Sequence, residues 1–146
     1  MLNSIKNNLF VINNIYSLEQ DFYYYNLNTR FTEKWYCSKI LSYKKYKELN
    51  LSFQDIRHLH CIHICKGGWH LSYFGDKYFI QNKIQHFGHQ EYNNDKYTNL
   101  DVIDLKINNH TDLYGRDNQQ IEKISLSNNT YLPDNYEKYL LRFILY

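Results

Sequence analysis

The chain has little proline, glycine or cysteine: its 146 residues include one proline, five glycines and three cysteines. So few prolines and glycines exclude a flexible linker architecture. The three cysteines, Cys37, Cys61 and Cys65, cannot all pair with one another, so the sequence contains no disulfide framework. We therefore expect a globular protein from a reducing compartment.

Long hydrophobic runs and a strong net charge are also missing. No stretch approaches the roughly eighteen apolar residues of a membrane span, and the N-terminus lacks the apolar centre of a signal peptide. A net charge of +2 and a pI near 8.3 are too mild for a dedicated nucleic-acid binder. The basic run at residues 44–47 is short and is predicted to be a solvated surface. We expect a soluble chain with no membrane span and no nucleic-acid partner.

Tyrosine is abundant, with 16 residues, and asparagine, lysine and isoleucine are frequent as well. A joint excess of these four residue types is explained more simply by an AT-rich genome, such as that of a large virus or a parasite, than by a binding function. At 17.9 kDa the chain is long enough for one modest domain over residues 1–146, but short for a complete nucleotide-sugar enzyme.

A cluster of histidines and cysteines between residues 58 and 70 suggests a zinc site. If residues 58–65 form a strand, Cys61, His63 and Cys65 share one face at intervals too long for convergence on a single tetrahedral ion. The spacing also lacks the turn-forming residues of a zinc knuckle. We interpret these residues as structural histidines and core cysteines, with a zinc or nucleic-acid module as the least favoured class of function.

The densest chemistry lies at residues 67–74, Gly-Gly-Trp-His-Leu-Ser-Tyr-Phe, followed at residues 89–91 by His-Gln-Glu. A glycine pair lets the backbone approach a ligand closely, and here it precedes an indole, an imidazole, a hydroxyl and a phenol. Such a mixture binds sugars. The alternative is a strand end that is rich in aromatic residues.

The order of these motifs resembles the second half of glycosyltransferase family 17, the β-1,4-mannosyl-glycoprotein 4-β-N-acetylglucosaminyltransferase family. The resemblance covers residues 18–116. It rests on Asp21-Phe22-Tyr23-Tyr24-Tyr25-Asn26-Leu27-Asn28, Trp35, Gly68-Trp69-His70-Leu71-Ser72-Tyr73-Phe74, Lys83-Ile84 and His89-Gln90-Glu91.

The resemblance implies transfer of N-acetylglucosamine from a UDP-sugar to a mannose hydroxyl of a glycan or glycoprotein acceptor, with inversion. It also implies a divalent metal, Mn²⁺ or Mg²⁺, and a Golgi setting with a membrane anchor. The implied fold is α/β, a nucleotide-sugar transferase (GT-A-like) fold with a mixed sheet and flanking helices.

The family's metal and diphosphate site depends on a segment of the form Ser-Asp-x-Asp-Glu-Ile-Pro, and no such segment occurs in this chain. The acidic pairs Glu19 and Asp21, and Asp101 and Asp104, stand in the wrong order and context. We therefore expect a partial fold whose N-terminal metal-binding half is absent, with no metal bound by this chain alone. An unpaired sheet edge would then favour self-association or pairing with the missing half.

Hydrophobic periodicity places these motifs on elements. Residues 4–16 fit a weak helix or a helix followed by an extended piece, and residues 43–49 fit a helical turn or a loop. Strands are predicted at residues 22–27, 35–43, 58–65 and 69–74, the first bounded by Asn28-Thr29-Arg30. Helices are predicted at residues 77–87, capped by Asp76 and ended by Gly88, and at residues 98–108. Residues 136–145 fit a short helix or strand.

Inverting transfer needs a general base for the acceptor hydroxyl, and the candidate catalytic residues are His70 and Glu91. Each has a plain alternative: His70 as a hydrogen-bonded scaffold histidine and Glu91 as a solvated loop carboxylate. His89 is a weaker candidate, as an imidazole ligand in a complete enzyme. We expect residues 67–72 and 89–91 to lie side by side, with His70 and Glu91 facing one cleft.

The candidate substrate-binding residues surround these bases. Gly68 allows close approach of the backbone, Trp69 and Tyr73 would stack on sugar faces, and Ser72 would supply a polar contact. Arg116 could pair with a diphosphate, since a guanidinium matches phosphate oxygens in a fork, and otherwise is a surface arginine. The sequence thus predicts a glycosyltransferase-like enzyme, or alternatively a non-catalytic carbohydrate- or partner-binding remnant or one half of a split enzyme.

Overall fold

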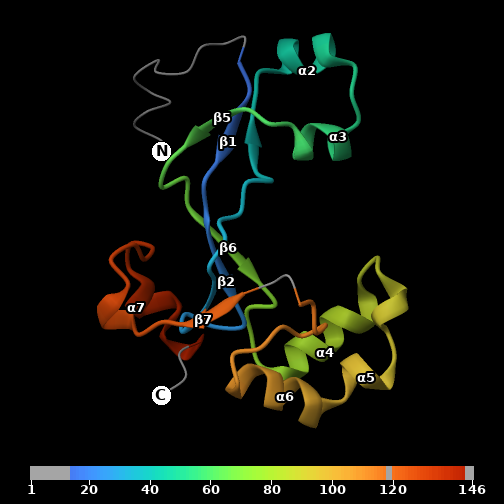
Figure 1. Ribbon diagram of the computed structural model, residues 1–146, viewed down its shortest axis with the longest axis vertical. Coiled ribbons are helices and arrows are strands. Elements are labelled where there is room, and N and C mark those ends of the chain that lie inside the picture. Colours follow the sequence, from blue (N-terminus) through green and yellow to red (C-terminus); the bar gives the residue numbers. More distant parts are fainter. Residues whose placement is uncertain (1–13, 118–119, 144–146) are drawn as a thin grey trace. The chain divides into compact units, whose positions relative to one another are not determined.

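The computed structural model describes residues 14–117 and 120–143, and shows an α/β protein with two mixed sheets and flanking helices (Figure 1). The chain divides into two compact units. Unit 1 comprises Met1–Asp21 and Lys34–Gly68, and unit 2 comprises Phe22–Glu33 and Trp69–Tyr146. Each unit is described by itself.

The sheet of unit 1 has the order β4-β1-β5. Its central strand β1 (Tyr16–Leu18) is antiparallel to β4 (Lys39–Ile40) and parallel to β5 (Ile62–Ile64). Parallel neighbours need a crossover connection, and helices α2 (Tyr43–Leu49) and α3 (Phe53–His58) lie on that connection.

Helices α2 and α3 both begin at serine caps. Ser42 accepts a hydrogen bond from the N–H of Lys45, and Ser52 forms a reciprocal capping box with Asp55. Helix α2 ends at Asn50, whose φ of 50° is left-handed, a conformation that asparagine tolerates well. These local signals fix two short helices that bury little apolar surface of their own.

The sheet of unit 2 has the order β6-β2-β3-β7. Strand β3 (Thr29–Phe31) is antiparallel to β2 (Asp21–Tyr24) and to β7 (Ile121–Lys123). Strand β6 (Trp69–Ser72) lies beside β2, where the N–H of Tyr25 donates to the carbonyl of Ser72.

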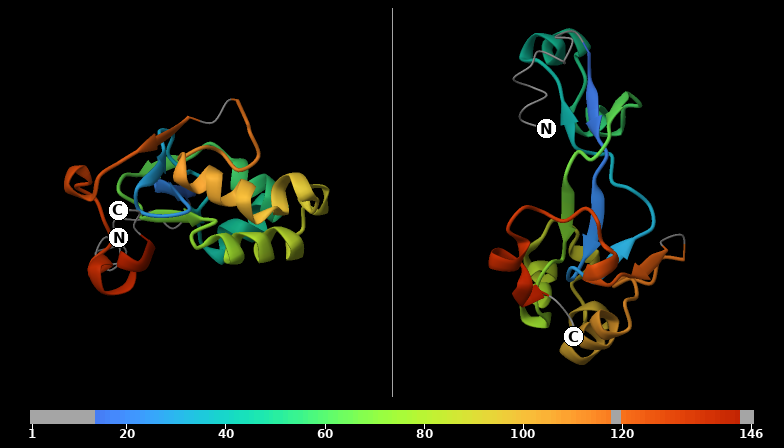
Figure 2. Two further views of the ribbon diagram at one scale, coloured as in Figure 1. Left: turned by 90° about the horizontal axis from the view of Figure 1, so that it is seen from below. Right: turned by 90° about the vertical axis from the view of Figure 1, so that its left-hand side faces the viewer.

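Helices cover this sheet. Figures 1 and 2 show α4 (Lys77–His86) and α6 (Leu100–Asn108) side by side, joined through η1 (Gln90–Tyr92) and α5 (Asp95–Thr98). Ile80, Ile84, Ile103 and Ile107 are buried between the helices and the sheet, as the spacing of one apolar helix face predicts. Four tyrosines and phenylalanines of the strands and loops complete the core: Tyr24, Tyr25, Phe31 and Tyr73.

The C-terminal part of unit 2 consists of short turns of helix: η2 (Leu126–Asn128), α7 (Tyr136–Tyr139) and η3 (Leu141–Phe143). The N–H of Leu27 donates to the carbonyl of Phe143 at 2.9 Å, which ties this segment to the β2–β3 turn.

Several predicted elements are confirmed. Asp76 accepts a hydrogen bond from the N–H of Phe79 and caps α4, and α2 forms where the sequence allowed either a helical turn or a loop. The glycine pair at residues 67–68 precedes β6 as expected. Most of the ambiguous first stretch, residues 4–16, lies outside the described residues.

All four predicted strands have other bounds in the structure: β2 ends at Tyr24 rather than at residue 27, and β6 ends at Ser72 rather than at residue 74. Of the segment expected to end a strand, Asn28-Thr29-Arg30, only Asn28 lies in the turn, and Thr29 and Arg30 belong to β3. The turn closes earlier because the side chain of Asn26 accepts hydrogen bonds from the N–H of Asn28 and from the hydroxyl of Thr29. Of residues 35–43 only two form β4, although Trp35 makes an isolated bridge to Gln20. Residues 58–65 are not one strand, since the capped helix α3 extends to residue 58 and β5 occupies residues 62–64.

Among the described residues no helix is long and apolar enough to cross a membrane.

Candidate functional site

The two glycines before β6 are required by the backbone of unit 1. A side chain at Gly67 would place its Cβ 2.8 Å from the Cβ of Leu18, closer than real contacts allow. Gly68 has a φ of +120°, which side chains rarely adopt, and its carbonyl accepts a bond from the N–H of Asp21. Close packing of the chain therefore accounts for both glycines, and the proposed ligand approach at Gly68 stays a prediction.

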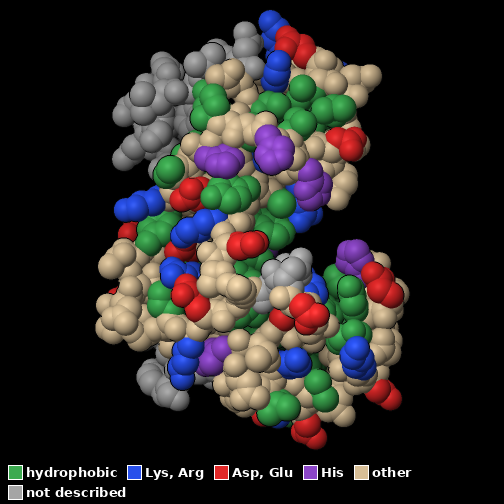
Figure 3. Space-filling view, in the orientation of Figure 1, with side chains coloured by type: hydrophobic (Ala, Val, Ile, Leu, Met, Phe, Trp, Pro, Cys, Tyr) green, Lys and Arg blue, Asp and Glu red, His purple; other side chains and the backbone are tan. Residues whose placement is uncertain are grey.

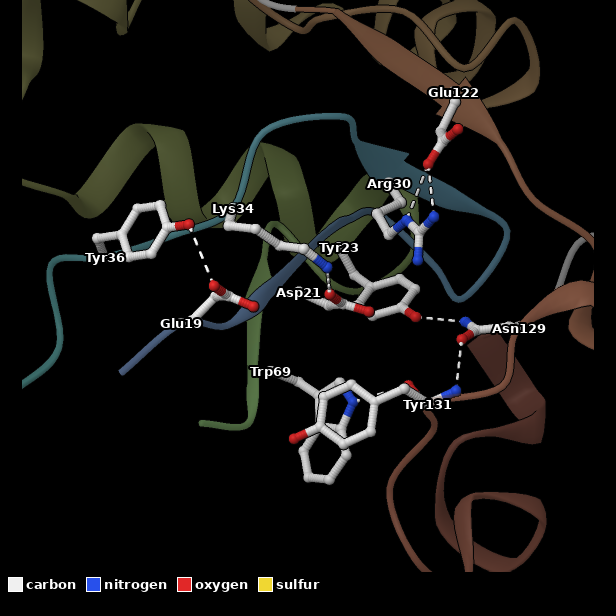
Figure 4. A network of polar contacts seen from close by, with 10 residues as sticks. All are labelled: Glu19, Asp21, Tyr23, Arg30, Lys34, Tyr36, Trp69, Glu122, Asn129 and Tyr131. Atoms are coloured by element: carbon white, nitrogen blue, oxygen red, sulfur yellow. Dashed lines mark hydrogen bonds and ion pairs between the residues drawn. The ribbon is translucent and has the colours of Figure 1, made fainter. Parts of the chain in front are cut away.

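Trp69 packs against the segment that follows η2. Its indole N–H donates to the carbonyl of Tyr131 at 3.0 Å, and the two rings lie 4.7 Å apart (Figure 4). Asn129 holds that segment, because its amide donates to the hydroxyl of Tyr23 and its side-chain oxygen accepts from the N–H of Tyr131. The indole is thus half-buried, and its single hydrogen-bond donor already has a partner.

Figure 4 also shows the ion pairs of the strands. In unit 2, Arg30 of β3 donates through Nε and Nη2 to Glu122 of β7 at 2.9 and 2.7 Å. In unit 1, Lys34 pairs with the buried Asp21. These pairs join neighbouring segments and leave few charges in the strands for other partners.

His70 and Ser72 share the opposite face of β6 from Trp69, since successive side chains of a strand alternate. The ring of His70 lies 4.8 Å from that of Phe22, in an edge-on arrangement. Phe22 in turn packs on the rings of Tyr24 and Phe31. His70 is half-buried at the margin of the aromatic core.

Tyr73 leaves β6 with a φ of 48° and turns its ring into the core, where the residue is 7% exposed. Its hydroxyl pairs with that of Tyr114, and the ammonium of Lys83 lies 4.3 Å from its ring centroid. Burial raises the pKa of Tyr73 and lowers that of Lys83. A sugar could stack on this ring only after its neighbours had moved, so stacking at Tyr73 stays a prediction that the geometry does little to support.

Tyr114 connects the candidate residues of unit 2. Its ring lies 4.2 Å from that of Tyr92 in η1 and 5.4 Å from that of Tyr97 in α5. On another side, the guanidinium carbon of Arg116 is 5.5 Å from its centroid. Burial raises the pKa of Tyr114, so the phenol stays protonated and can donate a hydrogen bond.

Arg116 is held in place by Asp112. The Asp112 carboxylate accepts from Nε at 3.1 Å and from Nη2 at 2.6 Å, and it also accepts from the backbone N–H groups of Tyr114 and Arg116. Burial alone would raise the pKa of Asp112, but these hydrogen bonds and the guanidinium charge outweigh it and lower the pKa. Arg116 thus has a fixed orientation while its side chain remains 40% exposed.

The exposed part of Arg116 borders a shallow cavity of about 300 Å³. Lys106 of α6 and His110 also line this cavity, together with Asp112. Its volume is at the lower end of the range for small-ligand sites. Asp117 lines it too, so two cations face two carboxylates and their charges balance. What the opening offers a phosphate-sized anion is the edge of the Arg116 guanidinium that Asp112 leaves free.

Glu91 lies in η1 beside His89. Its carboxylate is 2.9 Å from Nδ1 of the imidazole, and both side chains are largely exposed. Hydrogen bonds from the Glu91 backbone and from His89 lower the pKa of Glu91. The carboxylate is ionised at neutral pH and can accept a proton, although a lowered pKa makes it a weaker base.

These contacts group the sequence-predicted residues unevenly. Tyr73 and Arg116 both contact Tyr114, and these residues with Tyr92 form one cluster. Glu91 approaches this cluster through its partner His89, whose ring lies 6.2 Å from that of Tyr92 and 5.2 Å from that of Phe87. His70 contacts Phe22, whose ring packs on those of Tyr24 and Phe31 in the core. Trp69 lies on the other face of β6, and Gly68 belongs to unit 1. The shared cleft of His70 and Glu91 stays a prediction.

The described residues include no group of three or more histidine, cysteine or acidic side chains that could hold a metal ion. Several histidine side chains gather on the face that Figure 3 shows. His63 of unit 1 stacks on Tyr36 with the ring centroids 4.5 Å apart. Cys61 lies 3.7 Å from the ammonium of Lys39. In unit 2 the Asp112 carboxylate is committed to Arg116, so the residues present do not fit the divalent metal that the resemblance implies.

Comparison of the chain with family models, with curated proteins and with solved structures finds no match.

Sequence reasoning missed Asp112 and Tyr114, the two residues that organise the cluster. The segment Asp-Leu-Tyr-Gly-Arg contains the signal, since an aspartate four residues before an arginine can fold back on it within a turn. It also missed a second, larger cavity in unit 2, whose lining comes from four separated segments.

Proposed function

We propose that the chain is a glycosyltransferase-like protein of the family 17 type, with a partial nucleotide-sugar (GT-A-like) fold. Its relatives in that family would transfer N-acetylglucosamine from a UDP-sugar to a mannose hydroxyl. The α/β architecture is compatible with such a fold. The observation that carries the proposal is the arrangement around Tyr114, which joins Tyr73 at the end of the Gly-Trp-His-Leu-Ser-Tyr segment to the oriented guanidinium of Arg116.

In this proposal Arg116 binds the diphosphate of the sugar donor. Asp112 leaves one edge of the guanidinium free for a second partner and fixes its direction in advance, which lowers the entropy lost on binding. Lys106 adds a second cation at the same cavity. Glu91 would take the acceptor proton, with His89 orienting the carboxylate.

The experiment is a titration of the purified chain with UDP-N-acetylglucosamine, followed by saturation-transfer NMR. Arg116→Lys keeps the charge but removes the fork, and we expect it to weaken binding by about tenfold. Arg57→Lys is the matched control: Arg57 is exposed in unit 1, over the ring of Trp35, and its replacement should leave the affinity unchanged. Equal affinity of the two variants, or no binding at millimolar ligand, would contradict the proposal.

The alternative is a non-catalytic carbohydrate- or partner-binding protein with the same fold. In that case no metal neutralises a leaving diphosphate, since residues 1–146 contain no Ser-Asp-x-Asp-Glu-Ile-Pro segment whose carboxylates could hold one. We expect this chain alone to show no hydrolysis of, or transfer from, UDP-N-acetylglucosamine with Mn²⁺. Turnover that a chelator abolishes would refute this expectation.

A further inference from the structure

Unit 2 contains a cavity of about 720 Å³ that none of the sequence-predicted site residues lines. It lies where the N-terminal end of α4 meets the C-terminal half of α6, two helices that Figure 1 shows side by side. The segments that follow β2 and β6, and residues of η3, supply the rest of the lining. Cavities at the carboxyl ends of strands are the usual ligand sites of open α/β sheets.

One part of the lining is aromatic. The rings of Phe74 and Phe143 pack on each other at 4.9 Å, and Phe79 of α4 is 50% exposed. Tyr78, the preceding residue of α4, is 61% exposed and lines the cavity as well. Exposed rings at a cavity offer the flat apolar surface on which the C–H face of a sugar stacks.

The rest of the lining is polar, and its charges balance. Lys77 and Asp104 face each other at 3.7 Å, with both side chains partly exposed. Arg142 and Asp76 add one further charge of each sign. Two cations and two carboxylates do not favour an anion such as a nucleotide, whereas hydroxyl groups can donate to the carboxylates and accept from the cations.

Asn26 supplies a donor without a partner. The residue is 4% exposed, lines the cavity, and has no hydrogen-bond partner for Nδ2 among the described residues. Its orientation is fixed, because Oδ1 accepts from the N–H of Asn28 and from the hydroxyl of Thr29. A buried amide without a partner costs stability, but Nδ2 is itself covered, so a ligand oxygen gains this hydrogen bond only if neighbouring side chains move aside.

We infer that this cavity binds a neutral saccharide of two or three units, and that it is the acceptor subsite of the proposed function. The identity of the sugar as a mannose-containing glycan rests on that function. The existence of a neutral-saccharide site rests only on the exposed aromatic rings and the balanced charges. Its volume lies within the range of small-ligand sites.

The test is a titration of the whole chain with mannotriose, observed by saturation-transfer NMR, for the original protein and two variants. Asn108→Trp puts an indole into the cavity from an exposed position near the end of α6. Asn109→Trp is the matched control: Asn109 is the next residue, is also exposed, and does not line the cavity. We expect the first variant to weaken mannotriose binding by at least about tenfold and the second by less than about twofold.

Asp104→Asn is a second, milder probe, which should also weaken binding because a carboxylate acceptor is lost. Uridine monophosphate should not compete with mannotriose. No mannotriose binding at millimolar concentration, equal binding by the two tryptophan variants, or competition by uridine monophosphate would each overturn the inference. Loss of UDP-N-acetylglucosamine binding with mannotriose binding intact would contradict the proposed function and leave the saccharide site standing.

Discussion

Asp112 should contribute more to the stability of unit 2 than its position in a loop indicates. The side chain is 5% exposed and accepts four hydrogen bonds, two from backbone N–H groups and two from Arg116. Replacement by alanine leaves two backbone donors and a guanidinium without their acceptor.

The size of the effect follows from the two kinds of partner. Hydrogen bonds to a charged group contribute about 1.5–3 kcal/mol each when shielded. The Arg116 side chain is 40% exposed, so its pair is screened and closer to about 1 kcal/mol. With the two backbone bonds at the lower figure, we expect Asp112→Ala to lower the free energy of unfolding by about 4 kcal/mol. Asp112→Asn keeps one acceptor oxygen for the backbone and should cost about half as much.

Urea unfolding, followed by circular dichroism at neutral pH, measures both variants. Asp117→Ala is the control, because that aspartate is exposed and its replacement should change stability by less than about 0.5 kcal/mol. A cost for Asp112→Ala within that same margin would refute the reasoning.

The pH dependence gives an independent check of the same carboxylate. The pKa of Asp112 is lowered in the folded protein, so its contribution is present above the pKa of the unfolded chain and is lost as pH falls through the lower, folded pKa. Acidification below about pH 4, the ordinary range of aspartate, should therefore destabilise the original protein more than the Asp112→Asn variant. Parallel acid-unfolding curves for the two proteins would contradict this assignment.

Three further experiments test the core and one titrating group. Tyr24→Phe should be neutral or stabilising, because that buried hydroxyl has no partner among the described residues, whereas Tyr25→Phe loses a bond to a backbone carbonyl and should cost about 1 kcal/mol in urea unfolding. Ile103→Ala should cost about 2–5 kcal/mol and the exposed Leu105→Ala far less, so equal losses would count against the packing of α6. Burial and the charge of Lys123 lower the pKa of His110, so the unfolded chain binds the proton first and stability should fall as pH drops through about 6.5. His110→Asn, which tolerates the φ of 52°, should flatten that slope in thermal unfolding measured against pH.

Helix signals in the sequence predicted structure well because they are local. Asp76 and the isoleucines at positions 80 and 84 fix the start and the buried face of α4 without help from distant residues. The boundary of β3 could not be predicted in this way. The turn before it is closed by the side chain of Asn26, and the residues that resembled turn formers, Asn28 to Arg30, pair with β7 across more than ninety positions of sequence.

The sequence predicted which residue types form the candidate site, but not the direction in which most of their side chains point. A strand pattern places Trp69 and His70 on opposite faces, but it does not tell which face is covered by α4 and which by the segment around Tyr131. The Tyr73 side chain points into the core because its backbone φ is left-handed, and nothing in the sequence Ser-Tyr-Phe predicts that angle. Asp112 was missed for a similar reason, because an acidic loop residue is normally solvated.

The tyrosines join these observations. An AT-rich genome accounts for the number of tyrosines but not for their places. In unit 2, Tyr24, Tyr25 and Tyr73 occupy core positions where aliphatic residues are usual. Two of these three hydroxyl groups have partners, which are Tyr114 for Tyr73 and the carbonyl of Thr111 for Tyr25, whereas the hydroxyl of Tyr24 has none among the described residues. Both partners lie beside Asp112, in the loop that carries Arg116. The polar ends of the core therefore hold the guanidinium loop in place, so the packing of β2 and β6 and the geometry of the candidate anion site depend on the same hydroxyl groups.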